Sequence, residues 1–310
     1  MASYFTSTGE RPDLAAMEVN PPEGYIGGQI IPTFETSEKT GTVSYNAVTA
    51  DSAAQTGRGG STAPTEEAVA NTSTTWTCAE VIDRAYITPD EAKSMGGIEK
   101  ADKVGTIVCK RNVLNAIETA IVAKVLATAD AADATFDPGK AILQVQTALE
   151  AVRRYEGSRV LSASSIVVKG MVRSILADTT MGPVFARLVS GTTPATAASG
   201  LSLKLFSEAL AIYFGVDRVL MGADSVSNPA AKPGRFAITV VDNSGDPLSH
   251  KWKPIYAKNF LYLPDGTQPF QIRSFADEDD LTNKYTAVAW YNVVEFNAAA
   301  TYVFDGVTTS

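Results

Sequence analysis

Two strand patterns that lie close together in the sequence decide the fold: Thr42-Val43-Ser44-Tyr45-Asn46-Ala47-Val48 and Thr74-Thr75-Trp76-Thr77-Cys78-Ala79-Glu80-Val81-Ile82. Both alternate with the period of two that a pleated strand requires. Trp76, Cys78 and Ile82 fall on one face of the second pattern. The sequence therefore predicts two β-strands here, separated by far more residues than a tight hairpin needs.

The connection between them, residues 49–71, holds almost nothing able to build a core, and Gly57-Arg58-Gly59-Gly60 lies near its middle. Structureless connections of this length are uncommon in compact domains unless they are functional or disordered. Two strands alone are marginally stable in water, so residues 41–84 are expected to rest on another subunit. The glycine-rich tip lacks the lysine and the strand-to-helix context of a phosphate loop. Arg58 is either part of a flexible tip or presents its guanidinium to a carboxylate of a neighbouring subunit.

The composition limits the function classes. The chain has 310 residues, enough for one large core or two moderate ones. Its Lys+Arg count of 26 against 34 Asp+Glu gives a net charge of −8, which argues against a dedicated nucleic-acid binder. The most apolar window, residues 116–127, contains Glu118 and Lys124 and is too short to span a bilayer. Cys78 and Cys109 do not make a disulfide framework and are expected to be buried thiols in a reducing cytoplasm.

Helical periodicity is clearest over residues 102–129, which would form a spine roughly 40 Å long. The apolar stripe expected on this helix consists of Val104, Ile107, Val108, Leu114, Ile117, Ile121 and Val125. Thr88 and Glu91 have the spacing of a capping box just before it.

The remaining elements mix helices and strands without strict alternation, which indicates an α+β fold. Residues 1–40, with four prolines, are expected to be an extended arm and not a packed element. Residues 160–168 are expected to contain a buried strand that includes Ser165-Ile166-Val167-Val168. The other expected helices cover 140–155, 171–177 and 207–214, and the other expected strands cover 219–222, 236–241, 260–263, 270–275, 285–296 and 301–304.

No catalytic constellation is present. The single histidine, His250, cannot form a histidine-rich zinc site, and no Gly-x-Ser-x-Gly elbow supports a hydrolase. Asp277-Glu278-Asp279-Asp280 lacks the glycine and distal glutamate of a calcium loop. This run is a solvated turn, an intersubunit salt-bridge partner or a metal site. No enzyme activity, cofactor or metal is therefore predicted.

The succession of elements resembles the major capsid proteins of tailed bacteriophages, which have the Hong Kong 97 fold. The segment most similar to that family is Ala209-Leu210-Ala211-Ile212-Tyr213-Phe214-Gly215-Val216-Asp217-Arg218-Val219-Leu220-Met221-Gly222, a helix, a Gly-Val-Asp turn and a strand. The resemblance covers nearly the whole chain and rests on element order. No lysine and asparagine pair can be matched to the crosslink that some family members form.

The resemblance implies a structural subunit that assembles with itself into hexamers and pentamers of an icosahedral head around double-stranded DNA. It implies a virion location after assembly in the host cytoplasm, with portal, scaffold or decoration proteins as further partners and no membrane. The expected division is an N-terminal arm (1–40), an extended loop (41–84), a peripheral domain with the spine helix (85–133), an axial domain (134–262) and a return to the peripheral domain (263–310). The candidate intersubunit residues are Arg58, Glu66, Glu67, Trp76, Asp277, Glu278, Asp279 and Asp280.

Three other functions stay open. An encapsulin-type compartment shell would have the same fold. A hydrolase using His250 belongs to another class, as does a phage tail-tube or decoration protein, which the long spine helix disfavours.

Overall fold

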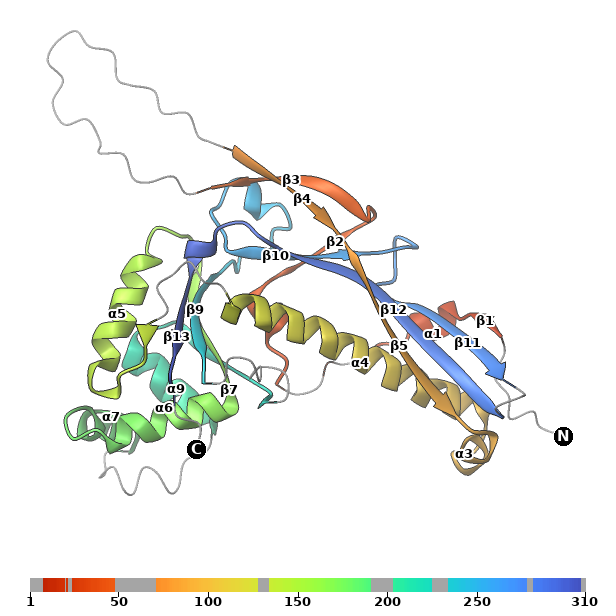
Figure 1. Ribbon diagram of the computed structural model, residues 1–310, viewed down its shortest axis with the longest axis horizontal. Helices are drawn as coiled ribbons and strands as arrows, with labels where there is room; N and C mark the ends of the chain where they lie inside the picture. Colours follow the sequence, from red (N-terminus) through yellow and green to blue (C-terminus); the bar gives the residue numbers. More distant parts are fainter. Residues whose placement is uncertain are drawn as a thin grey trace, which may run out of the picture.

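The long helix expected over residues 102–129 is present as α4, Ile98–Ala127, and lies beneath the larger sheet in Figure 1. At ~1.5 Å per residue its 30 residues extend about 45 Å. The capping box before it is also present, because the Thr88 side chain accepts from Glu91 N while the Glu91 carboxylate accepts from Thr88 N. The computed structural model describes residues 8–19, 21, 24–47, 71–127, 134–190, 203–224, 234–277 and 281–307.

The first sheet has six strands and is organised around β12, Thr282–Glu295, which pairs antiparallel with β11, β10 and β5. One face of this sheet packs on α4, and Cys109 and Tyr285 are buried between them. The other elements of this unit are β1 (Gly9–Glu10), α1 (Pro12–Ala15), α2 (Gly27–Ile30), β2 (Thr33–Thr36), β5 (Ala79–Ile87), α3 (Pro89–Ser94), β10 (Ala257–Tyr262) and β11 (Gln271–Asp277).

The buried face of α4 differs from the stripe expected from the sequence. Val104 and Val108 are 40% and 42% exposed, whereas Ile117, Ile121 and Val125 are buried as expected. The first half of the helix buries small and polar positions instead. Gly105 explains why small residues are buried here, because a Cβ at this position would overlap the ring of the buried Tyr285. Close helix–sheet packing therefore selects glycine over valine at this level.

The second strand pattern is two strands and not one, which corrects the prediction for residues 74–82. β4, Asn71–Thr77, pairs with β3, Thr40–Asn46, as a separate two-stranded hairpin. The chain then passes through the buried Cys78 and enters β5, which joins the first sheet. Ile82 therefore does not share a buried face with Trp76, and it is 48% exposed.

The N-terminal segment is packed, so the expectation of an extended arm is wrong for its described residues. Leu14, Ala15, Ile26, Ile30 and Ile31 are buried in the core that contains α4. β1 pairs with β11, and β2 pairs in parallel with β10. The segment thus completes the first sheet and covers one side of α4.

A second sheet of five strands has the order β6-β13-β9-β7-β8 and carries the remaining helices (Figure 1). Its core includes Met171, Phe185, Leu210 and Phe236. The elements are β6 (Ala134–Thr135), α5 (Ala141–Ala151), β7 (Ser158–Ser164), α6 (Ser165–Ala177), α7 (Met181–Ser190), α9 (Leu203–Phe214), β8 (Arg218–Gly222), β9 (Phe236–Val241) and β13 (Thr301–Asp305). Short 3-10 turns, η1 (Pro138–Lys140), η2 (Ser249–Lys251) and η3 (Ala298–Ala300), complete the description.

The apolar run at residues 165–168 begins helix α6, so its assignment as a strand is wrong. Ser164 ends β7, and its hydroxyl accepts from Val167 N at 3.4 Å as a helix N-cap. The Asp224 carboxylate also accepts from Ile166 N at 2.8 Å. Capping and packing against the second sheet override the strand preference of β-branched residues.

The α+β prediction is confirmed, and the expected strands of the last fifty residues are present. Two strands lie in different sheets from those that the expected division implied. β10 belongs to the first sheet with β12, and β13 belongs to the second with β9. No helix in the described ranges is long and apolar enough to cross a membrane.

Candidate assembly surface

The hairpin of β3 and β4 is fixed at its base by aromatic packing. Trp76 stacks on Phe260 of β10, with ring centroids 4.8 Å apart and an interplanar angle of 19°. Tyr45 lies against Phe296 at 5.0 Å. Figure 1 shows the two strands lying above the first sheet and directing their far ends away from it. The hairpin is therefore firmly attached to the first sheet. Residues 48–70, which connect its two strands, lie outside the described residues.

Hydrogen bonds also hold the other end of the hairpin, where Asn46 pairs with Asn71. Asn46 Nδ2 donates to the Trp252 carbonyl at 3.2 Å, and Asn297 Nδ2 donates to the Asn46 carbonyl at 3.2 Å. The Cys78 thiol lies 3.5 Å from the Phe260 carbonyl. Burial raises the pKa of Cys78, so this thiol is a packed, unreactive group, as expected from the sequence.

The face of the first sheet opposite α4 carries a shallow hollow of about 310 Å³. Ile82, Tyr86 and Phe275 are 48%, 70% and 38% exposed on this part of the sheet. Several exposed apolar side chains on one face of a sheet mark interaction surfaces in proteins. We call this surface the outer face; its lining residues are Glu80, Ile82, Arg84, Gln271, Arg273, Phe275, Thr286, Val288 and Trp290.

Charged groups lie between the apolar side chains of the outer face, because the register places Arg84 and Arg273 in the row between those of Ile82 and Phe275. Arg273 pairs with Glu10 at 3.1 Å, and Trp290 Nε1 donates to Glu80 at 3.3 Å. Arg84 has no ion-pair partner within the described ranges. Exposed apolar side chains interspersed with arginines are typical of protein–protein interfaces.

Two of the candidate intersubunit residues are described, and the structure does not bring them together. Trp76 is 6% exposed and packs within its own chain. Asp277 ends β11 and pairs with Lys284 at 2.5 Å. Arg58, Glu66, Glu67 and residues 278–280 lie outside the described residues. Their role between subunits stays a prediction, and Trp76 would act there by holding the hairpin in position.

The environment of His250 is that of a packing side chain. It is 2% exposed, stacks on Phe296 at 5.4 Å and meets Phe34 edge-on at 6.3 Å. Burial, followed by the charges of Lys258 and Lys251, lowers the pKa of His250 to about 4. Its Nδ1 atom is buried without a hydrogen-bond partner, so no serine or carboxylate in the described part of the chain orients it. No group of three or more metal-ligating side chains occurs among the described residues.

The sequence analysis missed a row of buried polar side chains on α4. Asp102, Lys110 and Glu118 lie eight residues apart on one i, i+4 ridge of the helix, and all three are nearly inaccessible. Isolated buried charges are costly unless they are paired or hydrogen-bonded. The sequence signal was the eight-residue spacing of these three charges, which the search for apolar residues passed over because α4 carries other charged residues as well.

Each member of this row binds the N-terminal segment. Asp102 pairs with Arg11 at 2.9 Å, and Lys110 Nζ donates to the Ala15 and Met17 carbonyls at 2.7 Å. The Glu118 carboxylate accepts from Ile26 N at 2.6 Å and Gly27 N at 2.8 Å. Burial lowers the pKa of Lys110 to about 8 and raises that of Glu118. The three side chains thus hold the N-terminal segment against α4 at Arg11, at Ala15 and Met17, and at Ile26 and Gly27.

Comparison with known proteins identifies the fold. No protein-family model matches the chain, and no curated protein matches its sequence. A phage-related protein from Bordetella bronchiseptica RB50 is similar over 97% of this chain and 98% of its own, with 13% identity and a TM-score of 0.59. A structure of Microbacterium phage Oxtober96 covers 94% of each chain, with 8% identity and a TM-score of 0.59.

A third similar structure is the holo-SrpI encapsulin complex from Synechococcus elongatus PCC 7942. It is 12% identical, has a TM-score of 0.51, and the match covers 96% of this chain and 94% of that one. Identities this low establish the fold and leave the function to other arguments. The chain therefore has the capsid-type α+β fold that these phage-related and encapsulin structures share, as the sequence resemblance implied.

Proposed function

We propose that this chain is the structural subunit of a closed protein shell, the major capsid protein of a tailed phage. It assembles as hexamers and pentamers around double-stranded DNA. The uncovered outer face is the observation that carries the proposal, because a sheet that exposes Ile82 and Phe275 needs a protein partner to cover it. In a symmetric shell that partner is another copy of the same chain. Portal, scaffold and decoration proteins, and assembly in the host cytoplasm, belong to the same proposal.

The extended loop of one subunit is proposed to cover the outer face of its neighbour. The loop carries Arg58, Glu66 and Glu67, and the outer face offers Arg84 and Glu80, while the acidic run 277–280 begins at the end of β11 in the sequence. Both surfaces thus contain charges of both signs. Exposed ion pairs contribute only about 0–1 kcal/mol each, so they set the register while the exposed apolar side chains supply the affinity.

The acidic composition fits a lining that encloses DNA without holding it. Each phosphate that a protein neutralises releases counterions and adds affinity. A subunit with a net charge of −8 limits such contacts and leaves the packaged DNA free to move during entry and exit.

Electron microscopy and light scattering of the purified full-length protein test the assembly state. Closed shells, or hexameric and pentameric rings, are expected. A compact monomer at every salt and protein concentration would refute the shell function. Nuclease-protected double-stranded DNA inside particles from infected cells would support the phage assignment.

The interface has its own test in Ile82→Asp, with Val104→Asp as a matched control. Both positions expose a similar fraction of an aliphatic side chain, but Val104 lies on α4, away from the outer face. Ile82→Asp should leave a folded subunit that does not assemble, and Val104→Asp should assemble normally. Assembly of Ile82→Asp would exclude the outer face as the interface. Deletion of residues 50–69 should reproduce the Ile82→Asp result.

An encapsulin-type compartment is the second candidate, because the SrpI encapsulin has a similar fold. The two candidates differ in content. Particles purified from the native source should contain long double-stranded DNA if the chain is a capsid protein. Nucleic-acid-free particles enclosing one enriched enzyme would favour the compartment.

A further inference from the structure

Helices α7 and α9 carry apolar side chains on two sides. Their inner sides belong to the core of the second sheet, where Phe185 of α7 meets Tyr213 of α9 edge-on at 5.0 Å. Gly182 brings α7 so close to α6 that an added Cβ would overlap the Leu176 carbonyl. The inner side of α7 is therefore filled, and apolar residues on its outer side have no place in the core of their own chain.

The outer sides of the two helices expose four aliphatic side chains. On α7, Val184 and Leu188 are 52% and 45% exposed and lie about one turn apart. On α9, Leu205 and Ile212 are 47% and 70% exposed and lie about two turns apart. Residues at these spacings share one face of a helix, so each pair forms a stripe along its helix.

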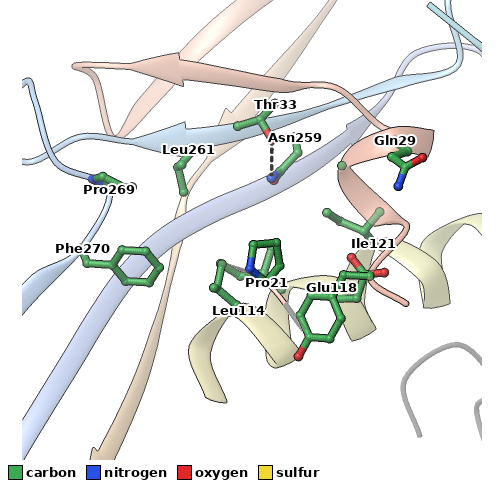
Figure 2. A pocket seen from close by; sticks show the side chains of 13 residues that line it. Pro21, Gln29, Thr33, Leu114, Glu118, Ile121, Asn259, Leu261, Pro269 and Phe270 are labelled. Atoms are coloured by element: carbon green, nitrogen blue, oxygen red, sulfur yellow. Dashed lines mark hydrogen bonds between the residues drawn. The ribbon is translucent and has the colours of Figure 1, made fainter. Parts of the chain in front are cut away.

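Elsewhere in the molecule the chain covers apolar helix residues itself. Figure 2 shows Leu114 and Ile121 of α4 at a cavity whose wall also contains Pro21 and Gln29 of the N-terminal segment. No described part of the chain covers the exposed side chains of α7 and α9 in this way. Apolar side chains that remain open together in a single chain mark a contact with another chain.

Each stripe contains one charged residue, and the two charges are opposite. Arg187 follows Val184 by three positions, and Glu208 lies three positions after Leu205 and four before Ile212. Both charged side chains are exposed, and neither has an ion-pair partner within the described ranges. We call Val184, Arg187 and Leu188 the α7 stripe, and Leu205, Glu208 and Ile212 the α9 stripe.

The two stripes are complementary to each other. Rows of side chains on one helix fit into the grooves of another, so two such stripes can pack together. The aliphatic side chains then exclude water around the two charges, and the pair of Arg187 with Glu208 sets the register. Within one chain these two residues do not form a pair, so the complementary stripe has to come from a second copy.

We propose that the α7 stripe of one copy packs against the α9 stripe of a second copy, with Arg187 paired to Glu208 across the interface. This contact is made by helices that pack with the second sheet, so it is separate from the outer face of the first sheet. It rests on the proposed shell function, in which every subunit meets other copies of itself.

Charge reversal tests the pairing in the full-length protein. Arg187→Glu and Glu208→Arg each place like charges opposite each other. In sedimentation velocity, each variant should therefore need at least about tenfold more protein to associate than the natural chain. The chain with both substitutions should associate like the natural chain. An equimolar mixture of the two single variants should do so too, because each variant supplies the charge that the other lacks.

Glu150→Arg and Arg153→Glu, near the end of α5, are the matched controls. These two residues form an exposed ion pair at 3.5 Å and belong to neither stripe, so their reversal should leave association unchanged. All four substituted positions are exposed, so the variants should fold, which circular dichroism confirms.

Undiminished association of Arg187→Glu or Glu208→Arg would overturn the proposal. Restoration by the double substitution but not by the mixture would overturn it as well, because the pair would then lie within one chain. If neither restores association, the two stripes do not face each other, and the proposal is wrong. A natural chain that stays monomeric at every concentration would instead refute the shell function itself.

Discussion

Acidification should destabilise the folded chain through one residue, His250. Its imidazole is 2% exposed and lies between Phe34 and Phe296, at the base of the β3–β4 hairpin. The charges of Lys258 and Lys251 oppose its protonation, while Asp246 favours it less strongly. Protonation would thus place a cation among aromatic rings and next to lysines, with only the Pro247 backbone and Asp246 to stabilise it.

The magnitude follows from the pKa of His250 in the two states. Burial lowers it from 6.5 in the unfolded chain to about 4 in the folded one. The unfolded chain therefore binds the proton first, so stability is complete above pH 6.5 and falls as the pH drops toward 4. At ~1.36 kcal/mol per pH unit the full loss is about 3 kcal/mol, a large fraction of the 5–15 kcal/mol typical of a domain.

Urea unfolding of the dissociated subunit, followed by tryptophan fluorescence at pH 7, 6, 5 and 4, measures this loss. His250→Phe keeps an aromatic ring at the site and cannot be protonated. Its free energy of unfolding should fall by about 3 kcal/mol less than that of the natural chain between pH 7 and pH 4. Groups such as Glu118 titrate in both proteins and cancel in the comparison. Identical pH profiles for the two proteins would refute the reasoning.

Three substitutions test the packing of α4 on the first sheet, of the N-terminal segment on α4, and of the β3–β4 hairpin on β10. Gly105→Ala should destabilise the chain by about 1–3 kcal/mol in thermal unfolding, because the new methyl overlaps Tyr285; a stabilised variant would contradict this packing. Lys110→Met leaves two buried carbonyls without a donor, so amides of residues 8–19 should exchange hydrogen faster while those of the second sheet do not change. Trp76→Ala removes the stack on Phe260 and should cost about 3–5 kcal/mol in urea unfolding; a smaller loss than 1 kcal/mol would show that the hairpin base is held by other contacts.

Local patterns in the sequence predicted the individual elements well. The spine helix, the strands of the last fifty residues and the α9–β8 pair are present near their expected positions. Each depends on a periodicity of 3.6 or 2 within one run of residues, or on a glycine at a helix end. The two limbs of the 41–84 region were also correct as β-structure, but the division of the second limb into β4 and β5 at Cys78 was not visible, because the sequence alternation continues through it.

The candidate surfaces were less predictable for a physical reason. The outer face draws its residues from β5, β11 and β12. The sequence of any one of these strands does not reveal that the three together expose several apolar side chains on one face of the sheet. Trp76 was chosen as an interface residue, yet its partner Phe260 lies far along the chain. Val104 and Val108 continue the apolar pattern of the helix but are exposed, because the helix packs on the sheet through Gly105, which lies against Tyr285.

The sequence by itself determined the long helix and the strand-rich end, because these depend on residues a few positions apart. The tertiary structure alone decided which side of α4 is buried, how the N-terminal segment docks and which sheet face stays uncovered. Those outcomes rest on pairs such as Glu118 with Ile26 and Asp102 with Tyr285, which are 92 and 183 residues apart. A buried charge is stable only when such a distant partner arrives, and no local pattern in the chain records which partner that is.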